Sequence, residues 1–186
     1  MKLVFLDAEF TGEHVYATPV SFGLVTLDAK ELYITLNDYD KDQVTDWLKE
    51  NVLSKIDAKK SIGKKEAYLK ISLFLKNYSL GEKIILVSAG KMMDITLLFQ
   101  MYHQEYPELK YYHHLHYLPD YLNHAEHIDL NTMFYLAGIK QPINRENYAG
   151  LGIKNQKHNA LYDAKIVRAC YLKLIKNSKL KGLINF

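Results

Sequence analysis

Apolar and polar residues alternate in short runs along the N-terminal part of the chain, a pattern typical of strands. We predict strands at about Lys2–Phe10, Val20–Asp28 and Leu32–Leu36. Only the turn Asp28-Ala29-Lys30 separates the second strand from the third. These two strands are therefore expected to form part of an antiparallel meander.

The remainder of the chain alternates helical and extended patterns. Apolar residues at helical spacing predict helices near Lys41–Asn51 and Lys64–Tyr78, and Tyr148–Gly152 reads as a loop. The later order of strand, helix, strand and helix is typical of a parallel half-sheet. Its expected elements are a strand at Lys83–Ala89, a helix at Asp94–Met101, a strand near Ile128, a short helix ending at Gly138 and a last helix from Ala160.

Two carboxylates interrupt the first predicted strand. Asp7 and Glu9 lie in an otherwise apolar run, where burying an ionised carboxylate is costly unless its charge is compensated. Residues two apart on a strand point the same way, about 6.5–7 Å apart. Such a pair can share a divalent cation, or hold two cations about 3.5–4 Å apart. The alternative is a strand end whose acidic side chains turn toward solvent.

A second motif opens the last predicted helix. Asn159 is placed as the N-cap, Asp163 about one turn inside the helix, and His158 in the loop before it. Between the two motifs, Asp94 follows a strand and a Gly-Lys turn, at the start of another helix. Each residue alone fits an ordinary cap or surface position, but their order and contexts together favour one catalytic centre.

The pattern resembles the DnaQ-like 3′–5′ exonucleases of the DEDDh type. Their signature is Asp-x-Glu on the first strand, a central Asp, and His-x-Ala-x-x-Asp before the last helix. The matching residues here are Asp7, Glu9, Asp94, His158 and Asp163.

The resemblance covers nearly the whole chain, from Lys2 to about Leu174, and is closest in style to small bacterial exoribonucleases such as ribonuclease T and oligoribonuclease. The segment Asp7–Gly12 is close to the usual opening of the family, and His127–Thr132 looks like its fifth strand running into a helix. The resemblance implies an α/β, ribonuclease-H-like fold. In that fold a five-stranded mixed sheet, antiparallel meander plus parallel half, is flanked by helices.

The resemblance also implies a reaction, two-metal hydrolysis that releases nucleoside 5′-monophosphates from the 3′ end of single-stranded RNA. Four residues would hold two Mg²⁺ or Mn²⁺ ions, with His158 as the general base. These metal ligands would be Asp7, Glu9, Asp94 and Asp163.

Further residues are candidates for substrate binding. By resemblance, Phe10 would stack on or wedge between terminal bases, unless it is a core residue at the strand end. Thr11 and Gly12 would offer backbone contacts to the terminal nucleotide. The net charge is +3, and Lys154 and Lys157 immediately precede His158. The phosphates of an entering polynucleotide would therefore pass close to these lysines.

Bulk composition narrows the class of protein. A chain of 186 residues, with 48% hydrophobic residues, is expected to form one exonuclease domain spanning 1–186. A single cysteine, Cys170, leaves neither an intrachain disulfide nor a Cys-based zinc site. The N-terminus is unlike a signal peptide and no apolar run approaches a membrane span. We therefore expect a cytoplasmic protein with no membrane partner.

Residues 105–127 are unusually rich in tyrosine and histidine. The pair His114-x-His116 has a spacing that zinc sites use, but no clear second pair accompanies it. The tyrosines fit three roles: they would stack bases, form a homodimer contact or cover the edge of the sheet.

Two other functions stay open. One is a DNA-directed 3′–5′ exonuclease of the proofreading type. The other is a non-catalytic nucleic-acid-binding module on the same fold, although all five catalytic positions are filled. RNA is preferred because the short chain looks like the small exoribonucleases, which is an argument by analogy.

Overall fold

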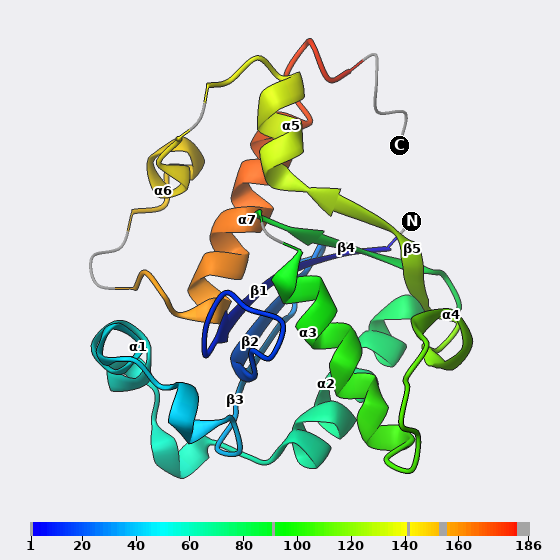
Figure 1. Ribbon diagram of the computed structural model, residues 1–186. Helices are drawn as coiled ribbons and strands as arrows, with labels where there is room; N and C mark the ends of the chain where they lie inside the picture. Colours follow the sequence, from blue (N-terminus) through cyan, green and yellow to red (C-terminus); the bar gives the residue numbers. More distant parts are fainter. Residues whose placement is uncertain (1, 91, 141, 153–155, 182–186) are drawn as a thin grey trace.

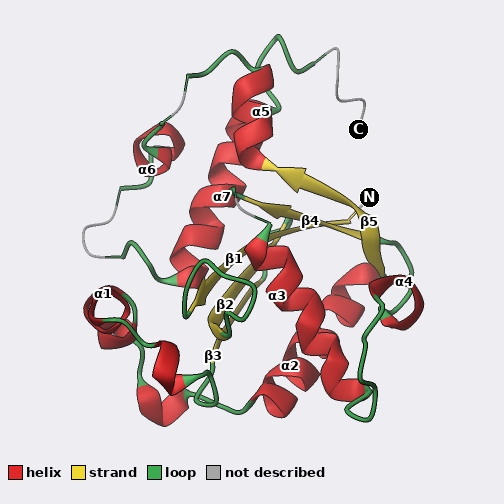
Figure 2. Cartoon of the chain, viewed as in Figure 1, coloured by secondary structure: helices red, strands yellow, loops and turns green. Residues whose placement is uncertain are grey.

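A mixed five-stranded sheet forms the centre of the molecule in the computed structural model, which describes residues 2–90, 92–140, 142–152 and 156–181 (Figures 1 and 2). The strand order is β3-β2-β1-β4-β5. Pairing is antiparallel between β1 and β2 and between β2 and β3, and parallel from β1 through β4 to β5. The strands are β1 (Lys2–Phe10), β2 (Pro19–Thr26), β3 (Glu31–Thr35), β4 (Ile84–Ser88) and β5 (Leu122–Asp129). The predicted ribonuclease-H-like mixed sheet is confirmed.

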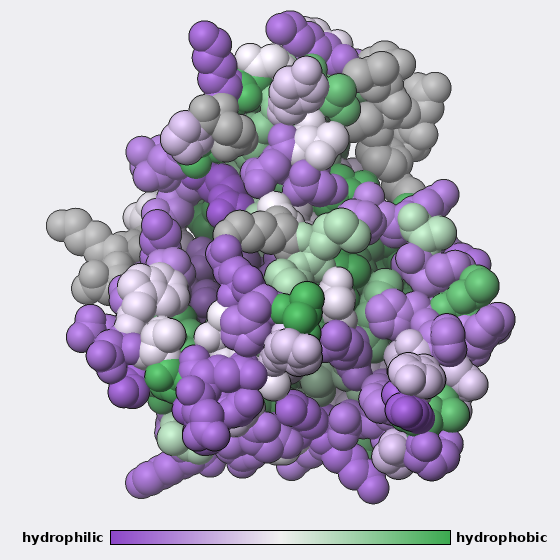
Figure 3. Space-filling view, in the orientation of Figure 1, coloured by the Kyte–Doolittle hydropathy of each residue, from purple (hydrophilic) through white to green (hydrophobic). Residues whose placement is uncertain are grey.

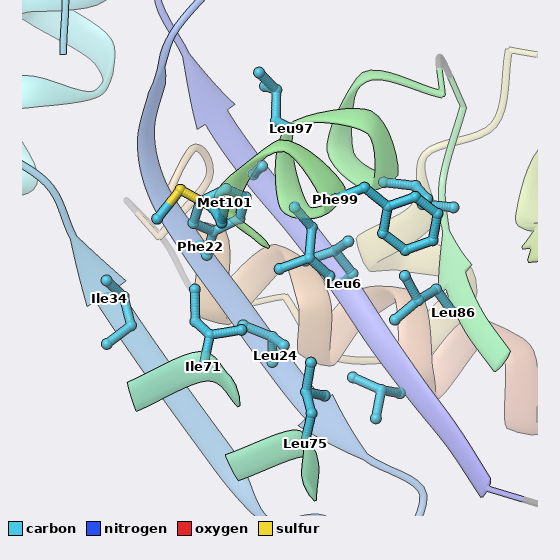
Figure 4. Packing of buried hydrophobic residues seen from close by; sticks show 14 of the residues in the cluster. Leu6, Phe22, Leu24, Ile34, Ile71, Leu75, Leu86, Leu97, Phe99 and Met101 are labelled. Carbon is cyan, nitrogen blue, oxygen red and sulfur yellow. The ribbon is translucent and has the colours of Figure 1, made fainter. Parts of the chain in front are cut away.

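Helices cover both faces of the sheet. On one face, α2 (Lys64–Ser79) and α3 (Met93–Met101) bury apolar side chains against β1 and β2, as Figure 4 shows. On the other face, α5 (Leu130–Leu136) and α7 (Ala160–Leu174) pack against a second apolar cluster. Cys170 is fully buried in that second cluster. Hydrophilic residues cover most of the face seen in Figure 3.

Alternation along β1 decides which face carries its acidic residues. Val4 and Leu6 belong to the cluster beneath α2 and α3, whereas Leu3 and Phe5 belong to the cluster beneath α7. Because side chains alternate along a strand, Asp7 shares the face of Leu3 and Phe5.

Two segments differ from the helix and loop predicted for them. The helix expected at Lys41–Asn51 is a 3₁₀ turn, η1 (Lys41–Gln43), followed by α1 (Asp46–Asn51). Thr45 has an extended backbone and its Oγ1 accepts the Leu48 N–H at 3.2 Å, so it starts a new helix.

The loop expected at Tyr148–Gly152 is wrong for its first two residues. They belong to α6 (Arg145–Ala149), which Asn144 caps and Gly150 ends with a φ of 72°. This helix lies beside α7 (Figure 1).

The Tyr- and His-rich segment folds back onto the protein. It contains α4 (His114–Tyr117), and the rings of Tyr106, Tyr112 and Tyr117 lie 5.0–6.2 Å apart. Tyr112 and Tyr121 pack against the cluster beneath α3. Covering the core beside the edge strand β5 is therefore the role that the contacts favour. In the described ranges the histidines of this segment are not gathered into a metal-binding group.

None of the helices in the described part of the chain combines the length and the apolar character needed to cross a membrane.

Candidate active site

The acidic residues of β1 lie beyond the end of its parallel partner. The β1–β4 ladder runs only from Lys2 to Phe5, whereas β2 stays paired along β1 past Glu9. Asp7 and Glu9 thus occupy the stretch of β1 whose edge toward β4 is open. On that stretch, the backbone N–H of Ala8 donates a hydrogen bond to a side chain, Asp94 Oδ1, at 3.2 Å. Asp94, in the first turn of α3 and only 8% exposed, is thereby held beside Asp7 and Glu9.

The start of α7 brings a fourth carboxylate to the same place. Asn159 Oδ1 accepts the N–H of Tyr162 at 3.1 Å, which confirms the predicted N-cap. Asp163 lies in the first turn, where its Oδ2 accepts the backbone N–H of His158 at 2.8 Å. That hydrogen bond ties the loop before the helix to the helix itself.

His158 is held between the carboxylates and the α1 region. Its Nδ1 lies 3.9 Å from Glu9 Oε1, and its backbone has a φ of 64°, an uncommon conformation for a non-glycine residue. The Trp47 ring lies edge-on to the imidazole, with ring centroids 5.0 Å apart. Lys55, in η2 (Leu53–Lys55), donates a hydrogen bond to the carbonyl of Lys157. The loop is thus held from outside as well as by Asp163.

Burial and mutual repulsion disfavour the ionised forms of the carboxylates. Burial first, then the neighbouring carboxylates, raise the pKa of Asp7 well above its usual value and that of Glu9 to about 8. Burial raises the pKa of Asp94 to about 7 and that of Asp163 to about 6. The positive charge of Arg145 acts in the opposite direction on Asp7, Asp94 and Asp163.

The pKa of His158 is shifted in the opposite direction. Burial, followed by the charges of Lys157 and Lys55, lowers the pKa of His158 from its usual value. This shift favours the neutral imidazole, which is the form that can accept a proton.

The five predicted catalytic residues line one cleft with a volume of about 790 Å³. Phe10, Thr11, Gly12 and Lys157 line it too, while Lys154 lies outside the described residues. Phe10 is half-buried and packs against the cluster beneath α3. Thr11 is 4% exposed, and its N–H is donated to the carbonyl of Thr18 at 3.0 Å. A substrate contact through that N–H would have to replace an existing hydrogen bond.

Several residues that line the cleft were absent from the predicted site, and two of them, Trp47 and Arg145, lie beside the candidate catalytic groups. Trp47 comes from α1, which begins later than the predicted helix, and Arg145 comes from α6, where no helix was predicted. Neither belongs to a motif, so only the contact with His158 and the position among the carboxylates single them out.

The donor set fits hard divalent cations. Carboxylate oxygens are the ligands that Mg²⁺ and Mn²⁺ prefer, and a cation would relieve the repulsion that raises these pKa values. Potential ligand atoms of Glu9, His158 and Asp163 lie within 4.8 Å of one another, the one such group in the ranges described. His158 is therefore placed to be either a ligand or a base.

Neither a protein-family model nor a curated protein matches the chain. Solved structures do match. The chain is similar to cell-death related nuclease 4 (CRN-4), with a TM-score of 0.67 and 14% identity over 95% of this chain and 64% of that chain. It is also similar to the Mg²⁺- and Mn²⁺-bound form of S. pombe Pop2p, with a TM-score of 0.61 and 14% identity over 98% of this chain and 86% of that chain. The chain thus spans less than two thirds of the length of CRN-4, and at this identity the likeness shows a shared fold.

Proposed function

We propose that this protein is a metal-dependent 3′–5′ exonuclease that releases nucleoside 5′-monophosphates from single-stranded RNA. One observation carries the proposal: four carboxylates and a histidine, from β1, α3 and the start of α7, meet in one cleft. Hydrolysis of a phosphodiester needs a place for cations, an acceptor for the proton of the attacking water and access for a strand. This cleft offers groups suited to each need.

Asp7, Glu9, Asp94 and Asp163 would hold two Mg²⁺ or Mn²⁺ ions. Such ions, when bound, make water a stronger nucleophile and stabilise the leaving 3′-oxygen. The Pop2p structure is described as Mg²⁺- and Mn²⁺-bound, which supports this choice of cations. Asp94 and Asp163 each use one oxygen for a backbone N–H, so each keeps its other oxygen for a cation.

His158 would act as the general base. Its neutral imidazole, with Nδ1 near Glu9, accepts the proton of the attacking water. Trp47 and the Asp163 hydrogen bond limit the freedom of the ring and its loop, which keeps the acceptor near the reacting atoms.

The substrate would enter past the rim of the same cleft. Lys157 is exposed and would attract backbone phosphates, and we extend the same role to Lys154 from its place in the sequence. Phe10 and Gly12 would contact the terminal nucleotide. A cytoplasmic location, a single domain and a homodimer stay predictions.

The alternative functions differ in substrate or in chemistry. A proofreading-type enzyme would use the same residues on DNA. A binding module without activity would keep the fold, but it would not need a metal-ligating cluster and a base side by side.

Strand shortening tests the proposal directly. Single-stranded RNA labelled at its 5′ end should yield a ladder of shorter products with Mg²⁺ or Mn²⁺ and none with chelator. RNA labelled at its 3′ end should release a labelled mononucleotide first. Binding without shortening, for every RNA and DNA strand tried with either cation, would favour the non-catalytic module.

A further inference from the structure

The lining of the cleft holds more acidic than basic side chains. Its described residues carry six carboxylates but only two permanent positive charges, those of Arg145 and Lys157. A phosphodiester adds further negative charge, so its approach depends on nearby cations. Lys157 is exposed at the rim, whereas Arg145 is half-buried and acts on three of the carboxylates. The six are Asp7, Glu9, Glu13, Asp94, Glu146 and Asp163.

Arg145 is anchored, yet most of its donors are unused. It begins α6, where Asn144 Oδ1 caps the helix by accepting the N–H of Asn147 at 2.9 Å. Its Nη1 donates to the carbonyl of Ala89, just after β4, at 3.0 Å. In the described structure this is the side chain's one hydrogen bond, and no carboxylate pairs with it within 4.0 Å. A guanidinium has five N–H donors, so a fork remains for a ligand.

We propose that Arg145 binds a non-bridging oxygen of the substrate phosphate and is a further catalytic residue of this site. The inference rests on the proposed exonuclease function. An arginine fork matches phosphate geometry and forms short, charge-assisted hydrogen bonds. Negative charge on the phosphoryl oxygens must be stabilised in the transition state, so the contact serves turnover as well as binding. The Ala89 carbonyl holds one end of the guanidinium, at Nη1, which leaves the edge formed by Nε and Nη2 for a ligand.

A binding comparison isolates the phosphate contact. Adenosine 5′-monophosphate and adenosine differ only in the phosphate, so calorimetry with both probes in Mg²⁺ separates phosphate recognition from base recognition. Arg145→Ala should weaken binding of the monophosphate about ten- to a hundredfold and leave adenosine binding unchanged. Arg145→Lys, which keeps the charge but loses the fork, should lie between it and the unmodified protein. Shortening of single-stranded RNA should lose a similar factor in kcat/KM.

Arg168→Ala is the matched control. Arg168 also donates to a backbone carbonyl, that of Leu27, from Nε at 3.2 Å and Nη2 at 2.8 Å, but it does not line the cleft. Its removal takes away the same charge and should leave monophosphate binding and kcat/KM as in the unmodified protein.

Two results would overturn the inference while the proposed function stands: unmodified affinity for the monophosphate in Arg145→Ala, or an equal loss for both probes. If Arg145→Ala does not fold, the same comparison is made with Arg145→Lys. Unchanged affinity of Arg145→Lys for the monophosphate would contradict a contact made by the arginine fork. Failure of the unmodified protein to shorten any strand and to bind the monophosphate would instead reject the exonuclease proposal together with this inference.

Discussion

Gly23 on β2 lies directly against the carbonyl group of Ala160, the first residue of α7. A Cβ atom at Gly23 would lie 2.1 Å from that carbonyl oxygen, far inside van der Waals contact. Gly23 is also the register partner of Asp7. The absent side chain therefore allows the start of α7, and Asp163 with it, to lie over the acidic part of β1.

Gly23→Ala should damage both stability and activity. The obstacle is helix backbone rather than a flexible side chain, so α7 must shift, at a cost of about 1–3 kcal/mol. A shift of about 1 Å at a catalytic group costs on the order of a hundredfold in rate. Thermal melting and RNA shortening measure the two effects. Gly152→Ala, where a Cβ meets nothing within 4 Å, is the control and should behave like the unmodified protein.

Asp7→Asn should abolish nuclease activity while the fold stays intact. The substitution removes one charge from a cluster in which like charges repel, so thermal stability in chelator should hold or rise. The exposed Asp120→Asn removes the same charge elsewhere and should keep full activity. Turnover of Asp7→Asn at the unmodified rate in saturating Mg²⁺ would contradict the two-metal proposal.

His158→Ala should lower turnover by about 10²–10⁴-fold, the usual range for a general base. Metal affinity should change little, because the carboxylates would remain. Calorimetric titration with Mn²⁺ checks this point, with the exposed His124→Ala as control. Loss of metal binding in His158→Ala would make the residue a ligand, as its closeness to Glu9 and Asp163 also allows.

The metal-free protein should lose stability as the pH rises. A carboxyl group whose pKa is higher in the folded state than in the unfolded state stabilises the folded state when it is protonated. This contribution is fully present below the unfolded-state pKa and is lost as the pH rises through the folded-state pKa. Those values are about 6 for Asp163, about 7 for Asp94 and about 8 for Glu9. The melting temperature in chelator should therefore fall by about 5 °C or more between pH 5.5 and pH 8.5.

Mg²⁺ should reduce that loss of stability, because cations compensate the ionised carboxylates. Asp7→Asn should flatten the dependence as well. A melting temperature in chelator that is constant or rises over this interval would show that the carboxylates do not repel one another as described.

RNA should be shortened faster than DNA of the same sequence, and from the 3′ end only. A protein distinguishes the two mainly through the 2′-hydroxyl. A polar group left unpaired when that hydroxyl is absent costs about 1–3 kcal/mol, roughly ten- to a hundredfold. Duplex ends should be poor substrates, because the terminal base must leave its stack to reach the site. Equal or faster cleavage of DNA at matched Mg²⁺ and salt would favour the proofreading-type alternative.

Local periodicity in the sequence determined most of the secondary structure. The pattern of β1 placed Asp7 and Glu9 two residues apart on one face, and Asn159 marked the start of α7. These features depend on residues that are neighbours in the chain, and the alternation of a strand or the capping of a helix requires little else. The order of motifs also pointed to four carboxylates and one histidine.

Tertiary structure alone decided which distant groups complete the site. The bond from Ala8 to Asp94 joins residues 86 positions apart, and it exists because β4 ends where β1 continues. Trp47 reaches the cleft from a helix that begins later than predicted, and Arg145 from a helix that was not predicted, since Thr45 and Asn144 start these helices through side-chain caps. Such contacts depend on strand order, register and the close approach at Gly23, and no local pattern of residues encodes them.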